Sequence, residues 1–470
     1  MKKSALALLV LINMMSPHQI YANQNKSRFE KLELFNKVLY LIESQYYRDV
    51  DTEKLIEGAI NGMMNTLDPH SNFLDKEIFS RMQEETSGEF GGLGIEVSQK
   101  DGAILIITPI DDSPAYRAGI KPGDKIVEIN HESIVGMNLE DAIEKLRGKH
   151  KSKIHLGISR DGVDGILNFE LTREIIQIKP VKFELIQNQY AYIRLVQFQK
   201  KSGQYMAEAL KKLSDQAKKS GGLKGVVIDL RSNPGGLLDE AVEVSSIFLK
   251  EGVVVSTEGR DPKQKEVRYV KKTGFKELTL PIVVLINGST ASASEIVAGA
   301  LQDHKRALVM GSQSFGKGSV QSVAKIDDEK GVKLTIAQYM TPTNKKIQAI
   351  GIKPDIVIDE TEGAWVVDNR KESSIVREKD LRNHLTATVE TPEEKIEREA
   401  AEKIDREKRE QRLKELREAK NKPKTSTKDA DSLASSEEEV KGSPQNDYQV
   451  LQAVNYLNSI GIIKNLKLEK

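Results

Sequence analysis

The feature that constrains the fold most is an alternation of apolar runs and amphipathic helical patterns between about Pro180 and Val357. The apolar runs are KGVVIDL (224–230), PIVVLIN (281–287) and RALVMG (306–311), and helical patterns follow the first two in LLDEAVEVSSIFLK and ASASEIVAGALQD. Such alternation is typical of an α/β core, in which polar residues just past the strand ends usually carry the chemistry. The three runs are followed by the turns RSNPGG and NGST and the stretch GSQSFGKGS. These segments are therefore the candidates for a functional site.

Two other regions precede this core. Apolar residues recur at helical spacing over residues 29–86, which predicts a small helical domain. His70, in a turn of this region, is interpreted as a structural hydrogen-bonding residue, with catalysis as the alternative. Residues 88–173 contain short strand patterns broken by glycine turns, and one helix with Asn138 as its N-cap interrupts them. This composition predicts a strand-rich, peptide-binding module, with a plain β-barrel as the alternative.

The N-terminal residues have the composition of an export signal. A basic start precedes an apolar run from Ala5 to Met15, and the small residue Ala22 follows a polar stretch. The apolar run is short for a bilayer span, so a cleaved secretory signal is favoured over an uncleaved anchor. The sequence therefore predicts an exported protein of the bacterial periplasm or cell envelope.

Composition argues against several classes of function. The 470 residues carry a formal net charge of +1, so no global field favours nucleic acid. The chain has no cysteine, which excludes disulfides and thiolate chemistry, and its seven histidines show no paired metal-ligand spacing. We therefore expect no cofactor, no metal and no nucleic-acid partner.

The chain becomes strongly charged after Trp365. Opposite charges recur at helical spacing from Thr391 onward, but apolar residues are too sparse for a core, which favours a solvated helix. The stretch TSTKDADSLASSEEEVKGSPQ has the composition of a disordered linker. A last apolar helix pattern, DYQVLQAVNYLNSI, must pack somewhere on the folded protein.

Ser292 is a candidate nucleophile. It falls in the first turn of the helix after the second apolar run, where free N–H groups and the positive end of the helix dipole stabilise developing negative charge. The alternative is that Ser292 and its neighbours, such as Ser294, are only helix caps. His304 lies twelve residues on, roughly 18 Å along the helix axis, too far to act as the base.

Lys317 is the remaining candidate base. Gly311, Gly316 and Lys317 have the spacing of a phosphate-binding loop, but Gly318 replaces the hydroxyl residue that would ligate Mg²⁺. The next residues favour a strand hairpin instead of the required helix. A lysine base must be neutral, so burial must lower its pKa from about 10.4 by several units. Glycines on both sides would allow such an enclosure.

The string GSTASASEIVAGALQDHKRALVMGSQSFGKGSVQ closely resembles the active-site region of the carboxy-terminal processing peptidases, or tail-specific proteases, which are Ser–Lys endopeptidases. The resemblance extends from about Phe35 to about Ile358. It includes LIEGAINGMMNTLDPHSNFL, SGEFGGLGIEV, DLRSNPGGLL and TPTNKKIQAIGIKPDI, and Asn344 and Lys346 depart from the family's usual glycine and serine. The departures affect a loop and not the reaction.

The resemblance implies an α/β multidomain protein with a ClpP/crotonase-like peptidase core and an inserted PDZ domain. The expected parts are a signal peptide (1–22), an N-terminal helical domain (27–86), the PDZ domain (87–174), the Ser–Lys peptidase core (175–364), a charged helix and disordered linker (365–446), and a C-terminal helix (447–470).

Site residues are likewise carried over from the family. Ser292 corresponds to the nucleophile, Lys317 to the base, and Gln321 to a glutamine that orients the lysine in some members. Asp303 corresponds to an acidic residue that is important in others, although it could equally be a structural cap. The oxyanion donors correspond to the backbone N–H of Ala293 and a glycine of SNPGG, either Gly235 or Gly236.

The segment GGLGI, with SPAYRAGIKPGDKIVEIN downstream, resembles a PDZ domain. In that family the loop equivalent to Gly91, Gly92, Leu93 and Gly94 presents N–H groups to a ligand's terminal carboxylate, and the strand from Ile95 pairs with the peptide.

The resulting hypothesis is a serine endopeptidase that recognises apolar or unfolded C-terminal tails of exported proteins and cleaves them through an acyl-enzyme. A homo-oligomer or an adaptor protein stays open as a further partner. The alternatives are a catalytically silent PDZ scaffold of the cell envelope and, with least support, a nucleotide hydrolase.

Overall fold

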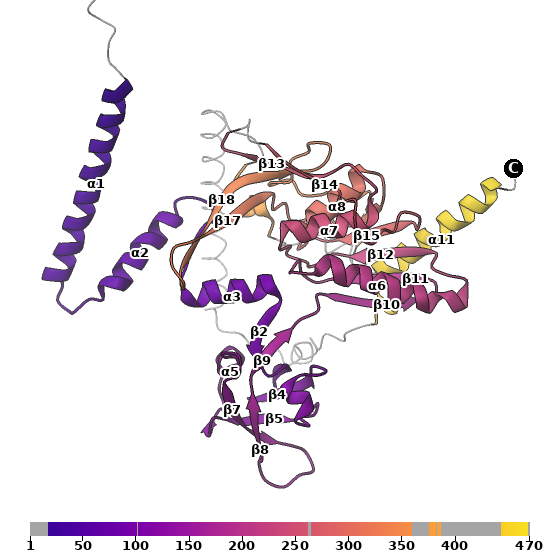
Figure 1. The fold of residues 1–470 in the computed structure, drawn as a ribbon, viewed down its shortest axis with the longest axis horizontal. Helices are drawn as coiled ribbons and strands as arrows, with labels where there is room; N and C mark the ends of the chain where they lie inside the picture. The colour runs from indigo at the N-terminus through magenta and orange to yellow at the C-terminus, as the bar shows by residue number, and fades with distance from the viewer. Residues whose placement is uncertain are drawn as a thin grey trace, which may run out of the picture. The chain divides into compact units, whose positions relative to one another are not determined.

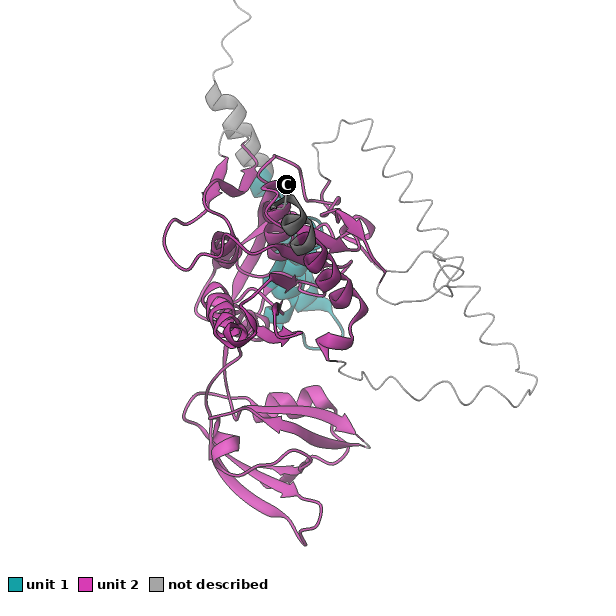
Figure 2. Cartoon of the chain, turned by 90° about the vertical axis from the view of Figure 1, so that its right-hand side faces the viewer, with its two compact units in different colours: residues 1–73 teal, residues 74–470 magenta. Residues whose placement is uncertain are grey.

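The computed structural model describes residues 17–100, 102–261, 265–359, 376–381, 383–386 and 443–468. Contacts divide the chain into two compact units, residues 1–73 and 74–470 (Figure 2). Most of the expected signal peptide, and most of the charged segment 365–446, therefore lie outside the described residues. Among the described residues, no helix combines the length and apolarity that crossing a membrane requires.

The first unit consists of helices α1 (Pro17–Gln45) and α2 (Thr52–Met64), and β1 (Asn72–Leu74) begins at its end. The Asp51 side chain caps α2 by accepting the N–H groups of Glu53 and Lys54. The predicted helices are confirmed, but most apolar side chains of residues 28–45 in α1 are exposed. Phe29, for example, is 70% exposed. Helical spacing was a correct guide to the backbone and a poor guide to burial.

The strand-rich module of the second unit folds around its own apolar cluster. Its main sheet has the order β3-β4-β5-β7-β8 with antiparallel pairs, and β2 pairs separately with β9. Helix α3 (Lys76–Ser87) precedes the module. The elements of the module are β2 (Glu89–Gly92), β3 (Ile95–Lys100), β4 (Ala103–Pro109), α4 (Pro114–Arg117), β5 (Lys125–Ile129), β6 (Glu132–Ser133), α5 (Leu139–Leu146), β7 (Lys153–Ser159), β8 (Leu167–Thr172) and β9 (Glu174–Gln177). The predicted cap of α5 is confirmed, since Asn138 Oδ1 accepts the N–H of Asp141 at 2.8 Å.

The predicted α/β core is also confirmed. Its sheet has the order β10-β11-β12-β15-β16-β19, in which β10 is antiparallel to β11 and the other pairs are parallel. The sheet elements are β10 (Val181–Ile186), β11 (Tyr190–Leu195), β12 (Gly225–Asp229), β15 (Ile282–Ile286), β16 (Leu308–Gly311) and β19 (Ile356–Val357). Helices and the second sheet complete it: α6 (Ser202–Ala217), η1 (Lys218–Ser220), α7 (Leu238–Phe248), β13 (Val253–Gly259), β14 (Glu266–Tyr269), α8 (Ala293–Asp303), β17 (Ser319–Lys325) and β18 (Gly331–Met340).

Both faces of the parallel sheet are covered, which explains its continuous apolar strands. Every residue of β12 and β15 is buried. On one face Val226 and Val284 join the apolar cluster that includes α6, α7 and α8. On the other face Val227 and Val283 pack with the C-terminal helix α11 (Tyr448–Leu468), the yellow helix of Figure 1. The predicted C-terminal helix thus packs on the core.

The parallel strands bring three turns to one edge of the sheet. Strands β12, β15 and β16 are neighbours, and their carboxyl ends lead into residues 230–236, 287–292 and 312–318 respectively. After the third turn the chain enters β17, which pairs antiparallel with β18. This hairpin confirms the prediction that no phosphate-binding helix follows Lys317. Three segments far apart in the sequence therefore meet at this edge of the sheet, and they contain the candidate residues Ser292 and Lys317.

Candidate active site

Ser292 lies at the N-cap of α8 in a strained backbone conformation. Its φ of 56° and ψ of −117° are unusual for a residue with a side chain, and such strain costs on the order of 1–3 kcal/mol. The residue is 9% exposed. Strain of this kind persists only where surrounding contacts enforce it, and it is common at active sites.

Glu295 holds the serine turn and the loop that carries Lys317 together. We call residues 314–318 the lysine loop. Oε2 of Glu295 accepts the backbone N–H of Ser292 at 2.8 Å and that of Lys317 at 2.9 Å, while Oε1 accepts the Gly316 N–H at 2.8 Å and the Ser314 hydroxyl at 2.5 Å. The backbone nitrogens of Ser292 and Lys317 are therefore separated by no more than the sum of their two distances to this oxygen. The candidate nucleophile and base are neighbours.

The Glu295 carboxyl is fully buried, with no exposed surface. Burial raises its pKa to about 7, although the four donors just described favour the ionised form and oppose the shift. Sequence reasoning missed this residue. The signal was present, since Ser292 and Glu295 have the S-x-x-E spacing of a capping box, and the Ser292 N–H does donate to the Glu295 side chain.

The lysine loop is packed closely by backbone, as its glycines suggested. A Cβ on Gly318 would lie 2.3 Å from the backbone nitrogen of Gln348, and one on Gly316 would lie 3.2 Å from that of Gly351. Lys317 itself is half-buried. A side chain at Gly318 would therefore collide with backbone, and one at Gly316 would be strained by its φ of +95° and by close backbone contacts.

Gly235 lies against the serine turn. A Cβ on this residue would lie 2.7 Å from Ser292 Cβ and 2.9 Å from the Ala293 nitrogen, and its φ is +99°. Its own N–H, however, donates to Asn233 Oδ1 at 2.9 Å. Gly236, at φ +137°, is as tightly packed, because a Cβ there would lie 2.0 Å from the Phe198 carbonyl oxygen. Of the two glycine candidates for an oxyanion donor, Gly235 thus has its N–H engaged within its own turn.

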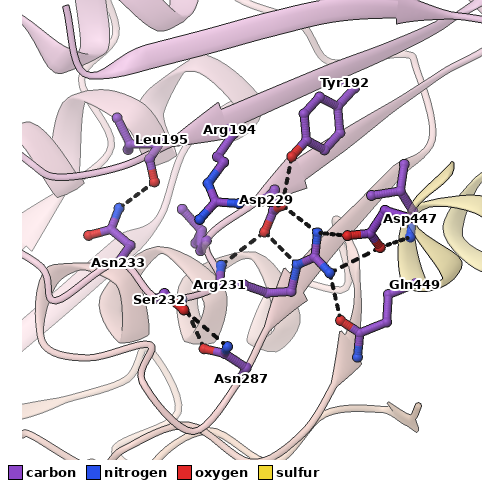
Figure 3. A network of polar contacts seen from close by, with 12 residues as sticks. Tyr192, Arg194, Leu195, Asp229, Arg231, Ser232, Asn233, Asn287, Asp447 and Gln449 are labelled. Atoms are coloured by element: carbon purple, nitrogen blue, oxygen red, sulfur yellow. Dashed lines mark hydrogen bonds and ion pairs between the residues drawn. The ribbon is translucent and has the colours of Figure 1, made fainter. Parts of the chain in front are cut away.

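Asn233 fixes this turn to the serine segment. Its buried side chain donates to the Leu195 carbonyl at 2.7 Å, and its backbone carbonyl accepts the Ala291 N–H at 3.0 Å and the Ser294 hydroxyl at 3.1 Å (Figure 3 shows the Asn233–Leu195 bond). The fully buried Ser294 is thus engaged in a structural hydrogen bond.

Arg231, which begins the same turn, links it to the C-terminal helix (Figure 3). Its guanidinium donates to both oxygens of the buried Asp229, at 2.9 and 2.7 Å, and on its other side contacts Asp447, at 2.9 and 3.1 Å, and Gln449, at 2.8 Å. Burial lowers the pKa of Arg231, but the bonds to the two aspartates outweigh it and raise the pKa overall. Tyr192 completes the cluster by donating to Asp229 at 2.8 Å.

Gln321 and His304 are held by contacts of their own. The Gln321 amide donates to Ser319 Oγ at 2.9 Å and to Thr335 Oγ1 at 3.4 Å. His304 is the C-cap of α8, and its Nε2 lies 2.7 Å from the Val253 carbonyl, so it is remote from Ser292 as predicted.

Asp303 lies at the last residue of α8, roughly 16 Å along the axis from Ser292. Its carboxylate accepts the hydroxyls of Thr341 and Thr343, at 2.5 and 2.6 Å, and pairs with Lys345 at 2.9 Å. Burial raises its pKa, but these donors outweigh burial and lower it to about 2. The geometry favours the structural interpretation of Asp303, as the anchor of the 341–345 loop.

In the strand-rich module, the structure places only some of the candidate peptide-binding residues in a loop. Gly91 and Gly92 are not loop residues, because they end β2 and pair with Ile175 and Glu174 of β9. Only Leu93 and Gly94 lie between the strands, and Leu93 is buried. Ile95 begins β3, which is an edge strand of its sheet in the described structure. A peptide could therefore pair with β3, as β-augmentation requires.

Across the described ranges, no three His, Asp or Glu residues are grouped so that they could hold a metal ion.

Comparisons with known proteins identify the family of the chain. The model of peptidase family S41 matches residues 189–358, the PDZ domain model residues 81–159, and the activating protease CtpB N-terminal domain model residues 12–78. A carboxy-terminal-processing protease of Bartonella bacilliformis is 45% identical over 342 residues, 73% of this chain and 78% of that protein. The carboxy-terminal processing protease CtpA of Bacillus subtilis is 38% identical over 75% of this chain and 74% of its own.

Among solved structures, the photosystem II D1 C-terminal processing protease is 28% identical, with a TM-score of 0.40, over 69% of this chain and 92% of that one. The family models and the two long, closely similar relatives lead to one conclusion: this chain belongs to the carboxy-terminal-processing proteases of peptidase family S41, and it is a serine-type peptidase with a PDZ domain.

Proposed function

We propose that the chain cleaves exported proteins near their C-termini with a Ser292–Lys317 dyad through an acyl-enzyme. One observation carries the proposal: a single buried oxygen, Glu295 Oε2, accepts the backbone N–H groups of both residues. This brings Ser292 and Lys317 together from different turns, and the strain at Ser292 adds to the case.

In this mechanism the neutral Lys317 amine takes the proton of Ser292 Oγ as that oxygen attacks the scissile carbonyl carbon. The tetrahedral oxyanion accepts the N–H of Ala293, at the positive end of α8, and that of a glycine in the SNPGG turn. Gly236 suits the second position better than Gly235, whose N–H already donates to Asn233. Collapse breaks the C–N bond, and the lysine ammonium returns its proton to the leaving amine. Water, deprotonated by the same lysine, then attacks the ester carbonyl, the bond from that carbon to Ser292 Oγ breaks, and the lysine ammonium returns its proton to Ser292 Oγ.

The substrate tail is proposed to bind along β3, whose outer edge pairs with no other strand of the described residues and suits an extended peptide. Export to the periplasm or cell envelope is proposed from the basic and apolar composition of the N-terminal residues.

The test is cleavage of a protein substrate with an apolar C-terminal tail by the full chain and by Ser292→Ala and Lys317→Ala. Each substitution should lower kcat by at least about 1,000-fold, with Tm near that of the wild type. Substantial activity in either variant would contradict the dyad. Failure of the wild type to react with a fluorophosphonate would instead favour a silent PDZ scaffold.

A further inference from the structure

Ten described residues beyond the S41 match lie against the lysine loop. The family model ends at residue 358, and residues 376–381 and 383–386 follow it. We call these ten residues the strap. Their central feature is the short helix η2 (Glu378–Asp380), in which Glu378 is fully buried although its neighbours Lys379 and Asp380 are exposed. A buried acid in a charged segment indicates a specific contact.

The strap contacts the lysine loop and its supports at several points. The Glu378 N–H donates to the Phe315 carbonyl at 3.2 Å, within the lysine loop itself. Arg377 donates to Gln313 Oε1 at 3.0 Å, just before the loop. At the other end, the Gln338 side chain donates to the Thr386 carbonyl at 2.9 Å. The strap is thus attached from one side of the lysine loop to strand β18.

A buried glutamine connects the strap to the residue after the base. Gln348 Oε1 accepts the Gly318 N–H at 2.9 Å, and its Nε2 donates to Glu378 Oε1 at 2.8 Å and to the Leu385 carbonyl at 3.0 Å. Gln348 is fully buried. The strap therefore supplies both acceptors for the amide whose oxygen holds Gly318.

The consecutive N–H groups of the lysine loop are held by two side chains. Those of Gly316 and Lys317 donate to Glu295, which α8 supports, and that of Gly318 donates to Gln348, which the strap supports. Removing the Glu378 acceptor would leave a buried amide donor with one partner fewer, so Gln348 would be free to rotate away from Gly318.

We propose that the strap is a positioning element for the base, acting through Glu378 and Gln348 on the backbone of Lys317. The inference rests on the Ser–Lys function proposed above. It also extends the active-site machinery beyond the matched peptidase domain into the charged segment that follows it.

The experiment measures the rate at which a fluorophosphonate labels Ser292, and the kcat and KM for a peptide substrate, in the full chain. Glu378→Ala should slow labelling and lower kcat by about 10- to 100-fold with KM nearly unchanged, because the base is misplaced and the substrate contacts are not. Glu378→Gln keeps an oxygen that accepts the Gln348 N–H and should restore most of the rate. Lys379→Ala, one residue on and exposed, is the matched control and should behave as the wild type.

Repeating the substitution in the Lys317→Ala background separates the two proposals. If the strap acts through the lysine, Glu378→Ala should not slow the residual labelling of Lys317→Ala any further. Equal slowing in both backgrounds, unaltered labelling by Glu378→Ala, or no recovery in Glu378→Gln would overturn the inference. Labelling of Lys317→Ala at the wild-type rate would overturn the dyad itself. Should Glu378→Ala not fold, Glu378→Met, which fills the volume without an acceptor, takes its place.

Discussion

At the scale of single residues, Gly235 shows how little room the serine turn has. A Cβ there would lie within 2.9 Å of Ser292 Cβ, the Ala291 carbonyl oxygen and the Ala293 nitrogen. Two of these atoms belong to the backbone, so the neighbours cannot rotate away. Any side chain must displace either the SNPGG turn or the proposed nucleophile and oxyanion donor.

We therefore predict that Gly235→Ala lowers kcat by about 100-fold or more, because displacements of about 1 Å are costly in an active site. The matched control is Gly274→Ala, since Gly274 has nearly the same positive φ, +98°, and nothing within 4 Å of its Cβ position. Both substitutions strain the backbone alike, but only the first crowds Ser292. Steady-state kinetics on both variants decides, and equal activities would contradict the crowding argument.

Glu295 gives a prediction about pH. Burial raises its pKa from about 4.5 to about 7 on folding. Between these values the unfolded chain has released the proton and the folded protein has kept it, so the favourable contribution of this group is complete below about pH 4.5 and is lost as pH rises through about 7. Glu295→Gln does not titrate. The Tm of the wild type relative to Glu295→Gln should therefore fall as pH rises from 4.5 to 7 and level off above it.

Thermal unfolding of both proteins at matched buffer and salt measures this difference, because all other groups titrate in both. A difference that grows with pH over the same range would mean that the four donors, and not burial, dominate the Glu295 environment.

At the scale of elements, the sequence predicts the strands, helices and turns that depend on patterns of neighbouring residues. The fully buried strands β12 and β15 are continuous apolar runs, the helix α5 has its cap at Asn138, and the β17–β18 pair follows the glycines around Lys317. Each of these depends on residues adjacent in the chain. Ser292 and Lys317 can be predicted for the same reason, since each comes soon after an apolar strand run in the sequence.

The contacts that hold the candidate site join residues far apart in the chain, so they produce no repeating pattern in the sequence. Glu295 reaches a loop that begins nineteen residues away, and Gln348 reaches Gly318 from thirty. The capping-box spacing of Ser292 and Glu295 predicts a contact within the helix turn, but nothing local predicts that the same carboxylate reaches the lysine loop. Pairing of Gly91 with β9, more than eighty residues on, converts an expected loop into a strand for the same reason. The exposed apolar face of α1 shows the converse, a local pattern without burial.

At the scale of the whole molecule, the core is completed by residues far beyond its last strand. The S41 match ends at residue 358, yet Val450, Ala453, Val454 and Leu457 of α11 are buried against the second face of the sheet. The same helix begins beside Asp447 and Gln449, which hold the Arg231 turn (Figure 3). Packing and polar contacts therefore both tie α11 to the sheet edge that carries the candidate site.

The last prediction tests whether α11 completes the core, by comparing two variants that place the same negative charge at adjacent positions of the helix. Val454 is 1% exposed within the apolar cluster, whereas Asn455 is exposed. Val454→Asp buries a carboxylate that has no designed partner, and we expect it to lower the free energy of unfolding by several kcal/mol, on the order of 3 or more. Asn455→Asp puts the same charge in solvent and should stay within about 0.5 kcal/mol of the wild type. Denaturant unfolding measures both, and a small effect of Val454→Asp would mean that α11 does not close the core. Because Gln449 of α11 and Asp447, the residue just before the helix, hold Arg231, Val454→Asp should also lower kcat at temperatures where the rest of the protein stays folded.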